Sequence, residues 1–270
     1  MKYLEFDLKK SGHYQPKLYA YILDTSPNIL LKEKRPAVII CPGGGYQYKS
    51  DREAEPVAMQ YLAKNMNAFI LQYSVAPARF PTAVMELASA VTLVRMHAEE
   101  WFINPDKIVI LGFSAGGHLA GSLGTLWNRP MFHTEFGDSL SWKPNGMILC
   151  YPVITMGEYT HEGSRTNLLG EDFTEADQEA LSLEKQVSKD TVPTFLWHTL
   201  EDNAVPVENS LYYAAALRKN GIPFEMHIYE KGEHGLSLCN EMTSSTESQN
   251  VPDNTGWVDL SVQWIKRQSF

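Results

Sequence analysis

The stretch Ile108-Val-Ile-Leu-Gly-Phe-Ser-Ala-Gly-Gly-His118 decides the fold. Its apolar start predicts a buried strand over Lys107–Phe113, and an Ala-, Gly- and Leu-rich helix is expected directly after it, over 115–126. Between them, Gly112-Phe-Ser114-Ala-Gly116 follows the pattern GxSxG. In this pattern a serine on a sharp strand-to-helix turn projects its hydroxyl above the edge of a sheet. Ser114 is therefore the candidate nucleophile, and a serine that merely caps the helix is the alternative.

Short β-rich runs alternate with helical patterns on both sides of this stretch, as in a parallel sheet with crossover helices. The other expected strands cover 3–8, 17–23, Ala37–Cys41, Ala68–Tyr73, Gly146–Tyr151, Thr194–His198 and Phe224–Tyr229. The other expected helices cover 53–65, 82–98, 208–219 and 256–267. A turn that contains Gly12 should join the first two strands, and 240–255 is expected to be a polar loop.

The alternation stops between 154 and 190, where Gly, Glu, Thr and Asp dominate. We therefore predict that 154–190 is a small lid inserted over one end of the sheet. A chain of 270 residues is of a size that one hydrophobic core can serve. The predicted fold class is α/β, with a single domain over 1–270, a mostly parallel central sheet, flanking helices and this lid.

Composition and charge exclude several classes of partner. The chain has 23 Lys and Arg against 32 Asp and Glu, which gives a net charge of −9. Nucleic acids and anionic membranes attract clustered positive charge, so neither is an expected partner. The first residues carry charges where a signal peptide needs an apolar run, and no uncharged run approaches the ~18 residues of a membrane span. A cytoplasmic location is the prediction.

The 3 cysteines lack CxxC spacing, which argues against both a disulfide framework and a structural zinc site. Cys41 and Cys150 lie within apolar runs and are expected to be buried. The sequence also lacks the HExxH pattern and other paired-histidine spacings of zinc enzymes. No metal and no organic cofactor is expected.

His234 is the candidate general base, because a histidine can take the proton of a serine hydroxyl near neutral pH. It lies in Lys231-Gly-Glu-His-Gly235, just after the last predicted strand, and parallel strands would bring this loop to the sheet edge that carries Ser114. His118, one helical turn after Ser114, is a weaker alternative that is expected to shape a pocket. His13 and His97 are expected on the surface, and His133 and His161 in loops without supporting neighbours. His198 is expected in the core, and His227 lies within the last predicted strand.

The third member of such a site is a carboxylate that fixes the histidine tautomer. Asp202 follows the strand Thr194–His198 and stands three residues before Val205-Pro, the usual position of the acid. Glu201 is its chief rival, and Glu158 and Glu162 are remote alternatives. The chain order of serine, aspartate and histidine is that of α/β-hydrolases.

Acyl transfer also needs backbone N–H donors where negative charge develops, an oxyanion hole. Cys41-Pro-Gly-Gly-Gly-Tyr46 follows a buried strand, and its glycines let the backbone approach a substrate closely. A phosphate-binding loop is the rival interpretation, but the chain has neither the last glycine of GxGxxG nor a following Gly-Lys-Ser/Thr. The expected donors are Gly44 or Gly45 together with Ala115.

Aromatic residues near the predicted strand ends are candidates for substrate binding, because aromatic rings stack on sugar or feruloyl rings. Most aromatic residues at such positions belong to the core, which is the competing interpretation. The candidates are Tyr46, Tyr73, Phe80, Trp127 and Tyr151.

Four segments together resemble α/β-hydrolase esterases: PGGGY, GFSAGGHLAG, the stretch from SLEKQVSKDTVPTFLWHT to EDNAVPVENS, and EKGEHGL. The likeness is greatest to the branch of acetylxylan and feruloyl esterase-like proteins, and it extends from about Ala37 to Ile265. Carried over by motif, the resemblance implies that Ser114 is the nucleophile, His234 the base and Asp202 its orienting acid. Cys41 stands where the family loop often has histidine, which puts one loop-stabilising hydrogen bond in doubt.

The resemblance implies a serine carboxylesterase that acts on small-molecule acyl esters, with O-acetyl groups of sugars or xylo-oligosaccharides favoured. An amidase such as an arylformamidase, or a peptidase-like hydrolase, is the alternative on the same fold. A non-catalytic binding protein is a third hypothesis, which the presence of all three site residues disfavours. A homodimer is a further expectation.

Overall fold

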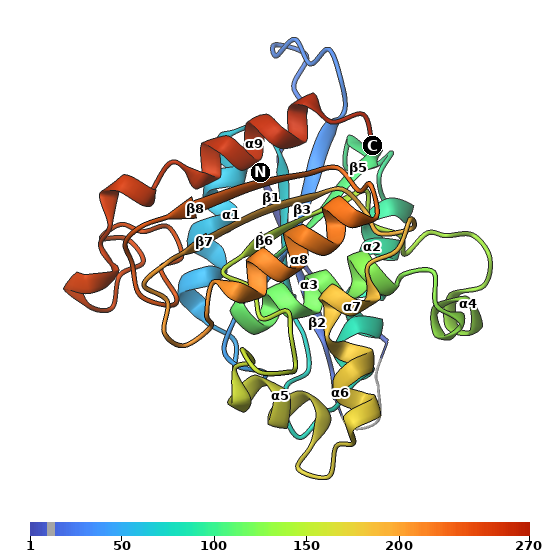
Figure 1. The fold of residues 1–270 in the computed structure, drawn as a ribbon. Helices are drawn as coiled ribbons and strands as arrows, with labels where there is room; N and C mark the ends of the chain where they lie inside the picture. Colours follow the sequence, from blue (N-terminus) through green and yellow to red (C-terminus); the bar gives the residue numbers. More distant parts are fainter. Residues whose placement is uncertain (10–13) are drawn as a thin grey trace.

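The protein is a sheet enclosed between two layers of helices (Figure 1), in a computed structural model that describes residues 1–9 and 14–270. Within these residues the sheet has eight strands in the order β1-β2-β4-β3-β5-β6-β7-β8. The strands are β1 (Lys2–Asp7), β2 (Lys17–Ile22), β3 (Arg35–Cys41), β4 (Asn67–Gln72), β5 (Ile103–Phe113), β6 (Gly146–Cys150), β7 (Thr194–Thr199) and β8 (Phe224–Tyr229).

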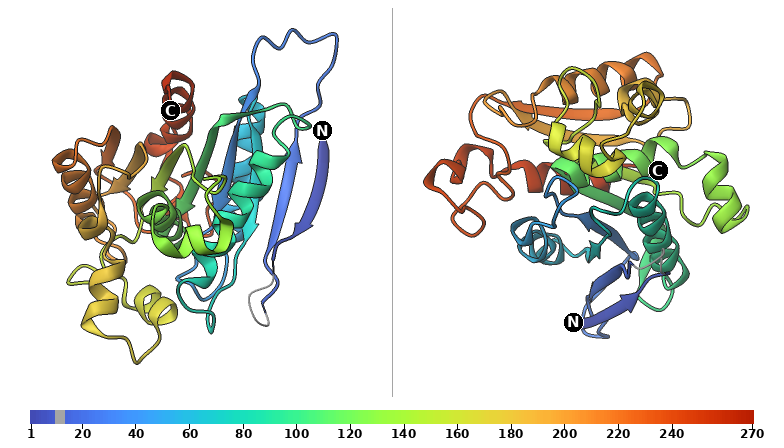
Figure 2. Two further views of the ribbon diagram at one scale, coloured as in Figure 1. Left: turned by 90° about the vertical axis from the view of Figure 1, so that its right-hand side faces the viewer. Right: turned by 90° about the horizontal axis from the view of Figure 1, so that it is seen from below.

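The six strands from β3 to β8 pair in parallel with their neighbours, and β1 and β2 add an antiparallel edge. Figure 2 shows this edge in dark blue at the outside of the sheet. The predicted α/β class with a mostly parallel sheet is confirmed. Continuous apolar runs in the central strands agree with this topology, because parallel strands are covered by helices on both faces.

Nine α-helices and three 3-10 turns connect the strands within the described residues. The helices are α1 (Glu55–Ala63), α2 (Thr82–Met96), α3 (Ser114–Leu126), α4 (Pro130–Phe136), α5 (Glu162–Leu169), α6 (Glu175–Leu181), α7 (Leu183–Gln186), α8 (Glu208–Lys219) and α9 (Trp257–Arg267). The 3-10 turns are η1 (Asp51–Glu53), η2 (Glu247–Gln249) and η3 (Pro252–Asn254).

Each face of the sheet has its own hydrophobic layer. Buried residues of α2, α3 and α8 pack in one layer, which we name the α3-side layer. Buried residues of α1 and α9 pack in the other, the α9-side layer. Because alternate side chains of a strand point to opposite faces, the central strands contribute to both layers.

Several boundaries differ from the prediction. The helix expected over 53–65 is divided into η1 and α1, and the strand expected from Lys107 begins at Ile103. Helix α4, which begins at Pro130 and buries Phe132, was not predicted from the sequence. Proline is favoured in the first turn of a helix because its missing N–H has no helical partner there. The turn predicted around Gly12 lies outside the described residues.

The predicted lid segment, 154–190, contains α5, α6 and α7, of which α5 and α6 lie at the bottom of Figure 1. None of the helices in the described parts of the chain is long and apolar enough to cross a membrane. Cys41 and Cys150 are fully buried, as predicted.

Candidate active site

Ser114 occupies a strained turn between β5 and α3. Its φ is +53°, a left-handed value that is uncommon for a residue other than glycine. The turn requires glycines at two nearby positions. A Cβ on Gly112 would lie 2.0 Å from the carbonyl oxygen of Gly116, and a Cβ on Gly116 would lie 2.1 Å from that of Cys41. These close approaches give the GxSxG pattern its physical reason here.

His234 connects Ser114 to Asp202. Its Nε2 lies 2.7 Å from Ser114 Oγ, and its Nδ1 lies 2.6 Å from Asp202 Oδ2. An ionised carboxylate can only accept, so Nδ1–H donates to Asp202 and the free lone pair of Nε2 accepts the Ser114 hydroxyl proton. The loop that carries His234 turns at Gly232 and Gly235, whose φ values are +125° and +80°. The structure thus brings together the three side chains that the sequence analysis selected.

Asp202 is buried and held by four donors. Its Oδ1 accepts the backbone N–H groups of Ala204 and Val205, at 3.1 and 2.8 Å. Its Oδ2 accepts His198 Nε2 at 3.2 Å in addition to His234. Burial raises the pKa of Asp202, but the hydrogen bonds and charges of His198 and His234 outweigh burial, so its pKa lies well below the usual value. The carboxylate is therefore ionised at neutral pH.

The rivals of these residues have other partners. The Glu201 carboxylate accepts the backbone N–H of Gly232 at 2.9 Å. His118 is fully buried, with Nδ1 3.0 Å from the Tyr46 hydroxyl and Nε2 2.9 Å from the Leu181 carbonyl oxygen. Burial lowers the pKa of His118 to about 4. Its position agrees with the predicted role in shaping the surroundings rather than in proton transfer.

The loop after β3 lies against the nucleophile turn. A Cβ on Gly43 would lie 3.1 Å from Cβ of Ser114. Gly44 and Gly45 have φ values of +123° and +63°, which glycine adopts without strain. Within the described chain, the backbone N–H groups of Gly44, Gly45 and Ala115 have no hydrogen-bond acceptor. These are the donors that the sequence analysis expected for an oxyanion hole.

A buried carboxylate that the sequence analysis missed, Glu53, holds this loop. It accepts the Gly43 N–H at 2.8 Å and the Tyr151 hydroxyl at 2.6 Å. The Tyr151 oxygen in turn accepts the N–H of Ser237, three residues after His234, at 2.8 Å. Glu53 and Tyr151 therefore tie the glycine loop to the histidine loop. No local pattern indicates such a pair, because the two residues stand 98 positions apart.

The loop has other support in place of the histidine that often precedes it in the family. The Tyr73 hydroxyl donates to the Pro42 carbonyl oxygen at 2.6 Å. Cys41 itself is fully buried at the end of β3. Tyr73, together with the Glu53 contact to Gly43, fixes the loop without a polar side chain at position 41.

Four of the aromatic candidates for substrate contact are buried, as the competing interpretation of a core role expects. Tyr46 and Tyr151 are 3% and 1% exposed, and their hydroxyls bond to His118 and Glu53. Tyr73 is fully buried against the glycine loop. Trp127 is 6% exposed, and its Nε1–H donates to the Asp190 carbonyl oxygen at 2.6 Å. Their polar atoms thus bond within the protein, and their side chains support the loops around Ser114 and the segment near Asp190.

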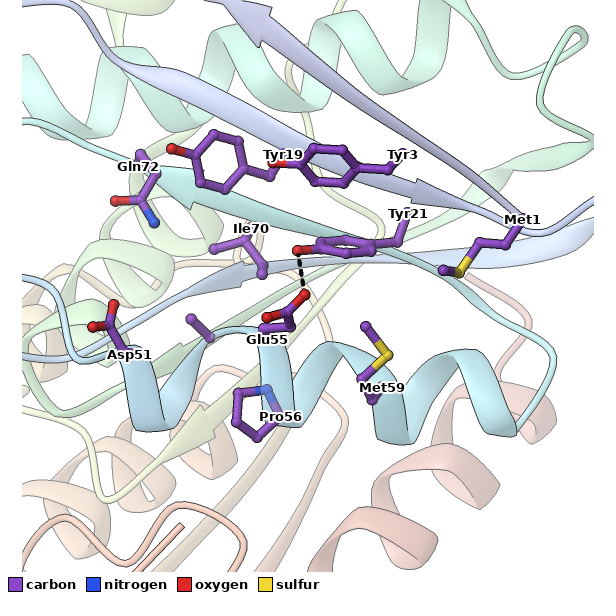
Figure 3. A pocket seen from close by; sticks show the side chains of 11 residues that line it. Met1, Tyr3, Tyr19, Tyr21, Asp51, Glu55, Pro56, Met59, Ile70 and Gln72 are labelled. Carbon is purple, nitrogen blue, oxygen red and sulfur yellow. Dashed lines mark hydrogen bonds between the residues drawn. The ribbon is translucent and has the colours of Figure 1, made fainter. Parts of the chain in front are cut away.

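A cavity of about 690 Å³ lies apart from these residues. Figure 3 shows it between tyrosines of β1 and β2 and the start of α1. Tyr3, Tyr19 and Tyr21 line it on one side, and Pro56 and Met59 on the other. None of the three residues of the Ser–His–Asp arrangement lines it.

Known proteins resemble this chain over most of its length. The family model described as BD-FAE matches residues 24–217. Endo-1,4-beta-xylanase B of Butyrivibrio fibrisolvens is 37% identical over 88% of this chain and 37% of its own length. Acetylxylan esterase of Xylanibacter ruminicola is 32% identical over 75% of this chain and 41% of its own length. The chain thus spans about two fifths of the length of these two relatives.

Solved structures share the fold. The acetyl ester-xyloside bifunctional hydrolase of Caldicellulosiruptor lactoaceticus is 38% identical with a TM-score of 0.79, covering 94% of this chain and 89% of its own. A carboxylesterase of Lactobacillus plantarum is 26% identical with a TM-score of 0.84, covering 99% of this chain and 98% of its own. Esterases and a carboxylesterase are thus among the proteins that this chain resembles, and the chain belongs to the BD-FAE family of α/β-hydrolases.

Proposed function

We propose that the protein is a serine carboxylesterase that removes short acyl groups from small esters, with O-acetyl groups of sugars or xylo-oligosaccharides as its substrate class. The observation that carries this proposal is the hydrogen-bonded chain from Ser114 through His234 to Asp202, with distances of 2.7 and 2.6 Å. Two relatives, an acetylxylan esterase and an acetyl ester-xyloside bifunctional hydrolase, support the choice of this substrate class.

In the first half of the reaction, Ser114 Oγ attacks the carbonyl carbon of the ester while its proton passes to His234 Nε2. Asp202 stabilises the resulting imidazolium through Nδ1–H. The tetrahedral intermediate then collapses: its bond to the alcohol oxygen breaks, and His234 gives the proton to the departing alcohol. The products of this half are a free alcohol and an acyl group bound to Ser114.

In the second half, water replaces the alcohol. His234 takes a proton from the water, whose oxygen attacks the acyl carbon and forms a second tetrahedral intermediate. The bond to Ser114 Oγ breaks, the proton returns from His234 to Ser114, and the carboxylic acid leaves. Both halves of the reaction use only these side chains, the ester and one water molecule.

The negative charge on each tetrahedral intermediate needs donors that are already in place. The N–H groups of Gly44, Gly45 and Ala115 supply them in this proposal, and the Glu53 and Tyr73 contacts hold the glycine loop in position before the reaction begins. One such donor contributes roughly 3–4 kcal/mol to transition-state stabilisation.

The test is release of acetate from p-nitrophenyl acetate and from an acetylated xylo-oligosaccharide by wild type and by Ser114→Ala. The expected result is that wild type cleaves both, whereas Ser114→Ala loses at least ~10⁴-fold in kcat because the nucleophile is gone. Full activity of Ser114→Ala would refute the assignment of the nucleophile.

Other outcomes separate the alternatives. Cleavage of the activated ester alone would keep the serine hydrolase but reject the sugar ester, and turnover of a formyl amide would then identify an amidase. Absence of turnover, together with failure of a fluorophosphonate probe to label the folded protein, would indicate a binding protein.

A further inference from the structure

His161, which the sequence analysis expected in a loop without supporting neighbours, is instead the N-cap of α5. Its Nδ1 accepts the backbone N–H of Ser164 at 3.1 Å, and lies 2.8 Å from the Ser164 hydroxyl. A ring nitrogen that accepts from a backbone N–H carries no proton. The single ring proton of neutral His161 is therefore on Nε2.

The ring is held between two glycines. A Cβ placed on Gly163 would lie 3.3 Å from Cε1 of His161, and one placed on Gly45 would lie 3.7 Å from the same atom. Two further members of α5 approach the same loop: Ser164 Oγ lies 3.9 Å from that position on Gly45, and Asn167 Nδ2 donates to the Gly45 carbonyl oxygen at 2.8 Å. Helix α5 thus packs on the glycine loop and fixes the ring above it.

The charges of His234 and Asp202 also act on His161. Burial lowers its pKa, and the charge of His234 lowers that pKa further, whereas Asp202 raises it. The ring is half-buried, and among the described residues no acceptor faces its Nε2–H. A neutral donor without an acceptor in the described part of the chain therefore stands beside Gly45, where the charges of His234 and Asp202 act on it.

We infer that His161 is a specificity-determining residue, whose Nε2–H donates a hydrogen bond to a hydroxyl or ether oxygen of the alcohol moiety, next to the ester. This inference rests on the proposed function. The carbonyl oxygen of the ester is assigned to the glycine loop and the departing alcohol must face His234, so a donor near both meets the alcohol beside its ester oxygen. Sugar esters present such an oxygen, because a hydroxyl group or ring oxygen neighbours each acylated carbon.

The chain offers a substitution that removes the donor and keeps the cap. In His161→Asn, the side-chain oxygen can still accept the Ser164 N–H, since asparagine is among the best N-cap residues. The shorter side chain has no donor at the position of Nε2. His133→Asn is the matched control, because His133 lies in α4 and contacts Asn128 rather than the site.

The experiment compares 2-hydroxyethyl acetate with propyl acetate, which have similar shapes and differ by one vicinal hydroxyl, and adds a monoacetylated methyl xyloside. His161→Asn should lower kcat/KM about tenfold for the two hydroxylated esters, through KM, because a lost hydrogen bond of about 1.4 kcal/mol corresponds to tenfold. Its kcat/KM for propyl acetate and all kinetic constants of His133→Asn should stay within twofold of wild type. The melting temperature of His161→Asn should match that of wild type.

An equal loss on all three esters would assign His161 a structural role and overturn the inference. Unchanged constants on all three, in a variant that melts like wild type, would overturn it as well. Wild-type protein that hydrolyses none of the esters would instead refute the proposed function, on which the inference depends.

Discussion

At the scale of single residues, the carboxylate behind His234 is the sharpest choice in the site, because Glu201 and Asp202 are adjacent. Of these two carboxylates, Asp202 accepts the Nδ1–H of His234, whereas Glu201 accepts the N–H of Gly232. We predict that Asp202→Asn lowers kcat about 10⁴-fold, since an amide favours the wrong histidine tautomer. Glu201→Gln keeps an acceptor for Gly232 and should retain kcat within threefold. Steady-state kinetics with p-nitrophenyl acetate distinguish the two, and the reverse pattern would contradict the assignment.

The nucleophile turn depends on a second single residue, Gly116. A Cβ there would lie 2.1 Å from the Cys41 carbonyl oxygen, so β3 and α3 would have to separate. We predict that Gly116→Ala lowers the free energy of unfolding by about 3 kcal/mol or more, or prevents folding, as overpacking in a rigid core does. Gly256→Ala is the control, because nothing lies within 4 Å of a Cβ at that position. Chemical denaturation measures both, and equal stabilities would show that the turn can relax.

At the scale of elements, α3 carries a buried histidine that couples stability to pH. His118 bonds to Tyr46 next to the glycine loop and to Leu181 at the end of α6, and burial lowers its pKa from 6.5 to about 4. Between these values the unfolded chain binds more protons at this residue than the folded one, so its effect destabilises the fold as pH decreases from 6.5 to 4. Through this residue, the free energy of unfolding decreases by about 3 kcal/mol in total once the pH lies well below both pKa values.

We predict that His118→Gln, which cannot titrate, has a stability that falls less steeply over this pH range than that of wild type. Urea denaturation at pH 7, 6, 5 and 4 gives the two slopes. The difference between the variants isolates His118 from carboxylates elsewhere, which titrate in both. Parallel slopes would indicate that His118 accepts a proton in the folded protein as readily as in the unfolded chain.

The distance in sequence between interacting residues explains which structural predictions succeeded. The strand, turn and helix around Ser114 were predictable because each follows from residues within a few positions, as do the loops that carry Asp202 and His234. The roles of Tyr46 and Tyr151 were not predictable. Both side chains are buried, and their hydrogen-bond partners stand 72 and 98 positions away in the sequence.

The same limit applies to the segment predicted as a lid. Because the segment is polar, no helix was predicted at the position of α5. Its N-cap, His161, was expected in a loop without neighbours that would hold it. The ring of His161 accepts the N–H of Ser164, three residues later in the sequence. The ring also packs against Gly45, which lies 116 positions earlier. A capping box needs Ser or Thr at the cap and Glu or Gln three residues later. The start of α5 has His161 and Ser164 at these positions, so the sequence carries no standard signal for a helix start.

At the scale of the whole molecule, the question is whether the two layers on opposite faces of the sheet unfold together. All 6 tryptophans are buried, and they divide equally between the layers. Those of the α3-side layer are Trp101, Trp127 and Trp142. Those of the α9-side layer are Trp197, Trp257 and Trp264. Because both layers pack on the same central strands, loss of the sheet removes the support of both.

We therefore predict one cooperative transition, in keeping with the single domain expected over 1–270. Two variants, each with the three tryptophans of one layer replaced by phenylalanine, report on the remaining layer by fluorescence. In each variant the urea midpoint from fluorescence should coincide with that from far-ultraviolet circular dichroism, which follows the whole backbone. The replacements lower stability, so the comparison is made within each variant. In one variant alone, the fluorescence midpoint could lie below the circular dichroism midpoint. That result would show that the layer which keeps its tryptophans unfolds first, and that the chain holds two cooperative units rather than one.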